Sequence, residues 1–271
     1  MPKVSVILIT YNEAANIRRC LTSVKWADEV IIVDSQSTDD TIRLAEVFSN
    51  VKIIERKWEG FVKSKQIAVE NTTNDWVLWL DADEEVTTDL EQEIKITLES
   101  NNRNIAFDMP RKTFFLGEWI KHCGWYPGRI VRLFNKKNCG FSDNLLHEKV
   151  NIDLGSGEVG HLKSDLLHYS YTSLYQYFDK MNKYGQYGAE ELQRRGKKFQ
   201  LWQLILNPIS TFIKFYFFNK GFLEGKRGFI IGVGSSFSNF IKYVNFYYLE
   251  KEKKSKQESK LKNASYTPDV V

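Results

Sequence analysis

The sequence predicts an α/β protein whose mostly parallel sheet carries helices on both faces. Two features of the first 83 residues support this fold class. Short apolar runs alternate with segments in which apolar residues recur every three or four positions, which is the spacing of one helix face. The last of these runs, Trp76 to Leu80, suits a strand buried on both faces and stops at Asp81-Ala82-Asp83.

The elements follow one another as strand, helix, strand, helix, strand, helix, strand. The strands are predicted at residues 3–10, 29–33, 51–54 and 76–80, and the third helix at about residues 61–71. Asn12 is a candidate cap for the first helix, and Ser37 or Thr38 for the second, because these side chains can accept hydrogen bonds from the free amides at a helix start. Right-handed crossovers between such strands produce a parallel sheet.

Three polar clusters should then meet at one edge of this sheet. They are Thr10-Tyr11-Asn12-Glu13, Asp34-Ser35 and Asp81-Ala82-Asp83, each at the carboxyl end of a strand. Asp81 and Asp83 are close enough in sequence to reach one hard cation, and Mg²⁺ or Mn²⁺ commonly takes its other ligands from substrate phosphates and water. The alternative is an acidic loop that caps the next helix. We expect a ligand site with a divalent cation, Mg²⁺ or Mn²⁺.

The same segments resemble a known enzyme family. They read Val4-Ser5-Val6-Ile7-Leu8-Ile9-Thr10-Tyr11-Asn12-Glu13, Ile32-Val33-Asp34-Ser35-Gln36-Ser37-Thr38-Asp39-Asp40-Thr41 and Trp79-Leu80-Asp81-Ala82-Asp83-Glu84. In this order and spacing they are similar to the motifs of family-2 glycosyltransferases, which have the GT-A fold. Later segments resemble the bacterial subgroup that includes lipopolysaccharide core β-1,4-glucosyltransferases: Trp125-Tyr126-Pro127-Gly128-Arg129, Arg132-Leu133-Phe134 and Leu146-His147-Glu148-Lys149-Val150.

The resemblance implies a role for each matching residue. Thr10, Tyr11 and Glu13, with Asn12 between them, match positions that line the pocket of a nucleotide sugar. Asp34 matches an acid that contacts the base or ribose, Asp81 matches the first acid of the metal motif near the ribose, and Asp83 matches the metal ligand. The sequence departs from the family at Lys65-Gln66, where many relatives have a basic residue followed by Asn. Helix capping and turn formation are the alternative roles for residues 10–13 and for Asp34.

An inverting sugar transfer also needs a base that deprotonates the acceptor hydroxyl. Glu148 occupies the position at which relatives carry this base, and His147 is the second candidate. Asp143 is a weaker competitor. The alternative for Glu148 is a surface carboxylate paired with Lys149 or a helix cap.

Each of five other side chains has two possible roles. Lys65 could face the diphosphate or be the solvated stem of a helix. Arg129 and Arg132 could bind phosphate, although in an alternating strand Arg132 would lie on the solvent face. Trp125 could stack on a sugar ring or pack in the core. His168 could complete the metal shell or be a hydrogen-bonded structural residue. Our acceptor-side candidates are Trp125, Arg132 and His147.

The length of 271 residues suits one catalytic domain with an appendage. We divide it into a nucleotide-sugar-binding half at residues 1–110, an acceptor-side part at 111–170, a helical extension at 171–250 and a basic, disordered or frayed tail at 251–271. The three cysteines are odd in number and widely spaced, which favours a reducing compartment over a disulfide framework or zinc site. No secretory leader is visible, so we expect the active domain in the cytoplasm.

Charge is unevenly distributed along the chain. Residues 1–100 hold 11 Lys and Arg against 19 Asp and Glu, whereas residues 101–271 hold 27 against 15. From Phe199 to Tyr248 the chain is also rich in aromatic residues. Such a segment suits helices that lie in the headgroup region of an anionic membrane, here the cytoplasmic face of the inner membrane. It could instead pack on the catalytic core or on a second copy, giving a homo-oligomer. No nucleic-acid-binding pattern accompanies the charge.

Together these features favour an inverting, metal-dependent glycosyltransferase. The resemblance implies a nucleoside diphosphate sugar donor, such as UDP-glucose, and a lipopolysaccharide-core or other lipid-linked glycan acceptor. One alternative is a sugar-1-phosphate nucleotidyltransferase, which would be expected to have a glycine-rich loop after the first strand. The other is a catalytically silent scaffold that binds a nucleotide sugar or a membrane.

Overall fold

The structure is a computed structural model that describes residues 2–100, 103–141 and 150–264, with side chains described as far as Lys256. The chain forms two compact units. The α/β unit comprises Met1–Lys121 and Trp125–Ser170, and the helical unit comprises His122–Gly124 and Tyr171–Val271.

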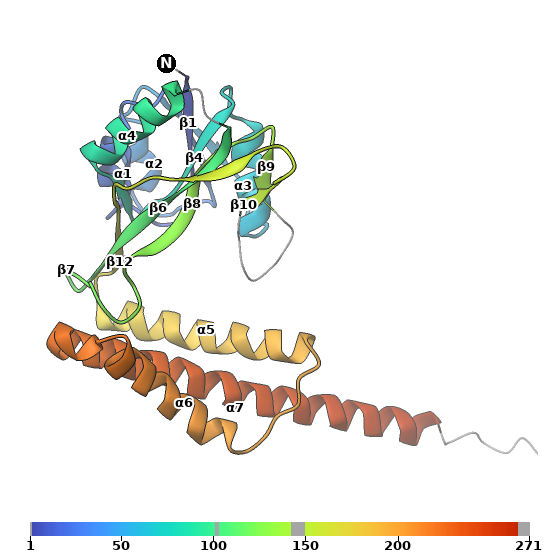
Figure 1. The fold of residues 1–271 in the computed structure, drawn as a ribbon. Helices are drawn as coiled ribbons and strands as arrows, with labels where there is room; N and C mark the ends of the chain where they lie inside the picture. The colour runs from blue at the N-terminus through green and yellow to red at the C-terminus, as the bar shows by residue number, and fades with distance from the viewer. Residues whose placement is uncertain (1, 101–102, 142–149, 265–271) are drawn as a thin grey trace, which may run out of the picture. The chain divides into compact units, whose positions relative to one another are not determined.

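The first half of the α/β unit contains the four predicted parallel strands (Figure 1). These are β1 (Val4–Thr10), β2 (Glu29–Asp34), β3 (Val51–Glu55) and β4 (Trp76–Asp81), in the order β3-β2-β1-β4. They alternate with α1 (Ile17–Ser23), α2 (Thr41–Ala45) and α3 (Phe61–Glu70). The predicted fold class is therefore confirmed.

Strand register brings the polar clusters together. Thr10 pairs with Asp34 across β1 and β2, and Ile9 pairs with Asp81 across β1 and β4. Because all three strands run in the same direction, their carboxyl ends form one edge, and the residues that follow them share it.

The second half extends the sheet with mainly antiparallel strands. From β4 the order continues β8 (Gly128–Asn135), β6 (Asn104–Phe115), β12 (Leu166–Tyr171) and β5 (Glu84–Val86). β7 (Glu118–Trp119) and β11 (Glu158–His161) both pair with β6, while β9 (Cys139–Phe141) and β10 (Val150–Ile152) form a separate pair. β12 pairs with β5 through His168 and Glu84, so it returns to the acidic motif.

Two apolar cores cover the two faces of the sheet. Val6 and Leu8 of β1 pack in a cluster with Ile17 and Leu21 of α1 and with residues of α4 (Thr88–Glu99). Ile7, between them in sequence, packs in the other cluster, which includes Ile67 and Ala68 of α3. Side chains of a strand alternate between faces, so the continuous apolar run of β1 serves both layers.

Both predicted helix caps are wrong. The first helix begins at Ile17 after Asn16, and the second at Thr41 after Asp40. Asn12 has a left-handed backbone, with φ of 55°, and its Oδ1 accepts a hydrogen bond from the Thr38 amide at 2.8 Å. These polar side chains therefore connect the loops after β1 and β2 to each other instead of starting helices.

The helical unit consists of α5 (Leu174–Arg194), α6 (Gln203–Ile213), a π-helical turn η1 (Lys214–Phe218), a 3₁₀ turn η2 (Gly221–Glu224) and the long helix α7 (Gly225–Ala264). In Figure 1 α5 and α6 both run alongside α7. The Tyr177 hydroxyl donates to the carbonyl of Ile231 at 3.0 Å, and Asn239 Nδ2 donates to Thr211 Oγ1 at 2.6 Å. These bonds tie α5 and α6 to α7.

The sequence predicted that residues 251–271 are either disordered or a frayed helix; α7 continues through Ala264, so residues 251–264 are helical. This segment contains no Gly or Pro and extends an established helix, which needs no new nucleus. Among the described residues, no helix is long and apolar enough to cross a membrane.

Candidate active site

A buried carboxylate organises the loops at the carboxyl edge of the sheet. Asp34 is fully buried at the end of β2. Its Oδ1 accepts the Ser37 amide at 2.7 Å, and its Oδ2 accepts the hydroxyls of Thr10 and Ser37, each at 2.7 Å. Ser37 Oγ in turn accepts the Asn12 amide at 2.8 Å. Thr10, Asn12 and Asp34 therefore lie together, as predicted, with Asp34 beneath the loops rather than at their surface.

Next to these loops lies a pocket of about 580 Å³. Its lining combines the predicted residues Thr10, Tyr11 and Glu13 with residues from the segment between β3 and α3, and comprises Ile9, Thr10, Tyr11, Glu13, Ser35, Gln36, Lys57, Trp58 and Phe61. Trp58 and Phe61 meet edge to face, with ring centroids 4.6 Å apart. A concave site with exposed aromatic rings and a few polar groups suits a flat heterocycle with a polar extension.

Glu13 is a partly buried acid in this lining. Its Oε2 accepts a hydrogen bond from Asn16 Nδ2 at 2.9 Å, and its amide donates to Thr41 Oγ1 at 2.7 Å. Burial raises the pKa of Glu13, and the negative charges of Asp83 and Asp81 raise it further. The Asn16 bond opposes this shift. Glu13 therefore belongs to the same electrostatic environment as the acidic motif.

Asp81, at the end of β4, is held by a buried arginine. Arg132 Nη2 lies 2.5 Å from Asp81 Oδ2 and 2.7 Å from Glu84 Oε1. Desolvation opposes ionisation of Asp81, but Arg132 and Lys65 outweigh it and hold the pKa at about 2. The Asp81 side chain is still 40% exposed, so a ligand can reach it.

Arg132 does not lie where either of its predicted roles requires. Its side chain is 1% exposed, so it neither lies on a solvent face nor is open to a phosphate. β8 lies inside the sheet between β4 and β6, and both of its faces are covered there. Burial raises the pKa of Glu84, and the charge of Asp81 adds to this effect while Arg132 opposes it.

Lys65 is also buried, at 2% exposure, which contradicts the solvated-stem alternative. Its Nζ lies 3.6 Å from the centroid of the Trp79 ring, and Arg132 Cζ lies 3.9 Å from the same centroid. The face of an indole attracts cations electrostatically. Trp79 on β4 therefore helps to hold two positive charges next to Asp81.

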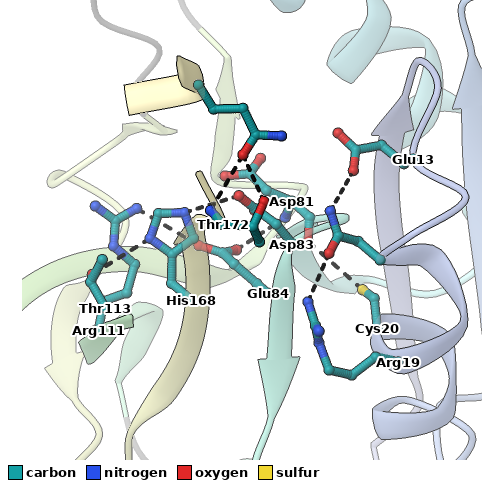
Figure 2. A network of polar contacts seen from close by, with 12 residues as sticks. Glu13, Arg19, Cys20, Asp81, Asp83, Glu84, Arg111, Thr113, His168 and Thr172 are labelled. Carbon is teal, nitrogen blue, oxygen red and sulfur yellow. Dashed lines mark hydrogen bonds and ion pairs between the residues drawn. The ribbon is translucent and has the colours of Figure 1, made fainter. Parts of the chain in front are cut away.

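Asp83 faces a histidine from the far end of the sheet. Its Oδ2 lies 3.3 Å from His168 Nε2 (Figure 2). The Asp83 carbonyl accepts the Tyr169 amide at 2.9 Å. Thr113 Oγ1 lies 3.5 Å from the other ring nitrogen of His168. No group of three or more His, Cys, Asp or Glu that could hold a metal occurs within the described part of the chain. A carboxylate with an imidazole is nevertheless a donor pair that suits Mn²⁺, whose remaining ligands would come from phosphate and water.

The structure does not describe all of the other predicted site residues. Glu148 and His147 lie outside the described residues, as does Asp143. Arg129 pairs with Asp108 through its Nη2 atom, which lies 2.6 Å from Asp108 Oδ1. Trp125 meets Phe115 edge to face at 6.0 Å, a packing contact.

Sequence reasoning missed four residues here. Lys57 and Trp58 follow β3, and the rule that placed the other polar clusters at strand ends would have selected them too. Glu84 directly follows the acidic motif, but only the position of Arg132 shows that they pair. Trp79 was assigned to the core by its apolar character, which gives no sign of the cations on its ring.

Comparisons with known proteins agree with this geometry. The model of the family described as glycosyl transferase family 2 matches residues 5–148. An uncharacterised glycosyltransferase of Rickettsia typhi is 35% identical over 251 residues, covering 89% of this chain and 86% of its own length. This chain belongs to glycosyltransferase family 2.

Two further proteins are similar to this family-2 enzyme, one in sequence and one in fold. The lipopolysaccharide core biosynthesis glycosyltransferase LpsC of Rhizobium meliloti is 26% identical over 249 residues, covering 90% of this chain and 91% of its own length. The mannosyltransferase PcManGT from Pyrobaculum calidifontis, solved in complex with GDP-Man and Mn²⁺, shares the fold with a TM-score of 0.54 at 15% identity. That match covers 91% of this chain and 87% of the other.

Proposed function

We propose that this family-2 glycosyltransferase is an inverting, metal-dependent hexosyltransferase. Its donor would be a UDP-hexose such as UDP-glucose, and its acceptor a lipopolysaccharide core or another lipid-linked glycan. The observation that carries the proposal is the meeting, at one sheet edge, of the aromatic pocket with Asp81, Asp83 and His168. Membership in the family favours a glycosyltransferase over the nucleotidyltransferase and the silent scaffold.

The pocket and the acidic motif suit two parts of such a donor. Tyr11, Trp58 and Phe61 offer exposed rings to a base. Asp81, ionised because of Arg132, would accept hydrogen bonds from ribose hydroxyls. Lys65, buried over Trp79, helps to lower the pKa of Asp81 and would supply positive charge to a bound diphosphate.

Asp83 and His168 would hold the divalent cation, which when bound offsets the charge that develops on the departing diphosphate. PcManGT was solved with Mn²⁺, which is consistent with this proposal. In the transfer, the acceptor oxygen forms a bond to the anomeric carbon of the donor sugar. At the same time, the bond between that carbon and the phosphate oxygen breaks. The acceptor proton passes to a carboxylate, for which we propose Glu148.

The acceptor class rests on similarity. The name of LpsC assigns it to lipopolysaccharide core biosynthesis, and its match covers 90% of this chain. The segments that resembled the lipopolysaccharide core subgroup lie in the region after residue 110, where acceptor specificity is expected.

The test is turnover on a panel of nucleotide sugars with membrane extract as acceptor, with Mn²⁺, with Mg²⁺ and with chelator. Asp83→Asn should reduce turnover by roughly 100-fold or more, as expected for a lost electrostatic stabiliser. Asp75→Asn is the matched control, because Asp75 precedes the other end of β4 and pairs with Lys137 at the surface. Full activity in chelator would remove the metal from the mechanism, and no turnover of any UDP-sugar would refute the donor class.

A further inference from the structure

The helical unit carries an exposed apolar surface. It is formed by α6 and the turn after it, and we call it the α6 apolar face. Its members are large side chains that are each at least half exposed: Trp202, Ile205, Leu206, Ile209, Phe217 and Phe218. Phe218 is 79% exposed and Ile205 61%. Soluble proteins expose such residues singly, and a contiguous set marks an interaction site.

The arrangement of α6 explains why this face is not the one that packs on α7. Pro208 is buried, and Thr211 Oγ1 accepts the hydrogen bond from Asn239 of α7. Residues 202, 205, 206 and 209 follow helical spacing on a different side from 208 and 211. α6 thus has two apolar sides, and α7 covers one of them.

The π-helical turn adds two exposed aromatic residues. η1 ends at Phe218, and the chain then reverses at Lys220, which has a left-handed backbone with φ of 55°. This turn leaves Phe217 56% exposed, next in sequence to Phe218. Aromatic side chains at the end of an aliphatic helix face are typical of the boundary between lipid headgroups and acyl chains.

Charge along this segment of the sequence has one sign. Between residues 195 and 223 the sequence contains five basic residues and no Asp or Glu. Lys197, Lys198, Lys214 and Lys220 are all exposed. A contact between two copies through this face would bring like charges together, which disfavours a symmetric dimer. An anionic surface complements both the lysines and the apolar side chains.

We propose that the α6 apolar face docks on an anionic lipid surface. The apolar side chains enter the boundary below the headgroups, and the lysines contact lipid phosphates. The described helices are too short or too polar to span a bilayer, so the association is interfacial. This goes beyond the proposed sugar transfer and does not depend on it.

The experiment measures co-sedimentation of the full chain with vesicles of phosphatidylcholine alone or mixed with phosphatidylglycerol, at low and high salt. Ile205→Asp with Ile209→Asp should lower the partition coefficient on anionic vesicles by roughly tenfold or more at both salt concentrations, because apolar burial is insensitive to salt. Ile96→Asp is the matched control. Ile96 is a 68% exposed apolar residue on α4, in the α/β unit.

A second variant separates charge from apolar burial. Lys214→Glu with Lys220→Glu should remove most of the preference for anionic over neutral vesicles, since each lysine near such a surface contributes roughly fivefold. High salt should remove the same preference in the unaltered chain. Phe217→Ser with Phe218→Ser adds an uncharged variant in case the aspartates disturb α6, and circular dichroism reports its folding.

Equal partitioning of the Ile205/Ile209 and Ile96 variants, with the Phe217/Phe218 variant also unchanged, would overturn the proposal. So would binding that is the same with and without phosphatidylglycerol. A concentration-dependent dimer that both apolar variants abolish, without vesicle binding by the unaltered chain, would assign the face to a second copy. Hydrolysis of the nucleotide sugar in detergent-free solution should be unchanged in these variants, so a failure here is distinct from a failure of the proposed reaction.

Discussion

Replacing Arg132 with methionine tests how the acidic motif is held in place. The substitution keeps an unbranched side chain of similar reach and removes the charge. Asp81 would lose a partner at 2.5 Å, and Glu84, with a fully buried side chain, would lose one at 2.7 Å. The second nearby cation, Arg111, lies 3.8 Å from Glu84 and cannot replace the lost hydrogen bond.

Removing one partner of a buried ion pair costs about 3–5 kcal/mol, because the other charge stays buried. Asp81 is 40% exposed and can be hydrated, so we expect the low end, about 3 kcal/mol. For a unit of this size that corresponds to a fall in Tm of roughly 6–12 °C. Adding Glu84→Gln, which removes the buried charge, should restore at least half of the loss.

The loss of stability caused by Arg132→Met should increase with pH. In the unaltered protein Arg132 holds the pKa of Asp81 at about 2, so this pair stabilises the fold above the ordinary pKa of an Asp and is lost as the pH falls towards 2. Without Arg132, burial would raise the pKa of Glu84 still further. A carboxyl group with a raised pKa in the folded state favours folding below its ordinary pKa and loses that contribution as the pH rises. Because of both effects, the stability of the Arg132→Met variant should be closest to that of the unaltered protein at low pH.

Thermal and urea unfolding between pH 3 and 8 would measure this. Arg129→Met is the matched control, on the same strand, because its pair with Asp108 is 35% exposed on the arginine side and should contribute about 1 kcal/mol or less. If Arg132→Met and Arg129→Met lower the free energy of unfolding by the same amount, with no dependence on pH, then Arg132 does not hold the acidic motif in place.

Two further predictions concern the reaction. Glu148→Gln should leave UDP-sugar binding nearly unchanged and reduce turnover by about 10²- to 10⁴-fold, the range for a lost general base; a silent Gln variant alongside an inactive His147→Ala would transfer the role to the histidine. Trp58→Ala should weaken UDP binding by roughly 5- to 100-fold in calorimetry, the range for one lost base stack, and an unchanged Kd would place the base elsewhere.

Long-range contacts explain what the sequence could and could not predict. The four parallel strands were predictable because their apolar runs and the intervening helical spacing are local patterns. Asn12 was misread as a helix cap because its partner, the Thr38 amide, lies 26 residues away. Arg132 was misread because strand alternation assumes one wet face, whereas β8 is covered on both. Trp58 was missed because it belongs to no motif, although it follows a strand as the other clusters do and lines the same pocket as Tyr11.

The position of β1 limits where the chain can change its length. β1 pairs with β2 on one side and with β4 on the other. Deleting a single residue within it would exchange the two faces for every side chain beyond the deletion or shift Thr10 away from Asp34. An insertion in the loop between β8 and β9 alters neither pairing. Relatives of different length should therefore differ in such loops, and the segment from Val4 to Thr10 should be free of insertions and deletions.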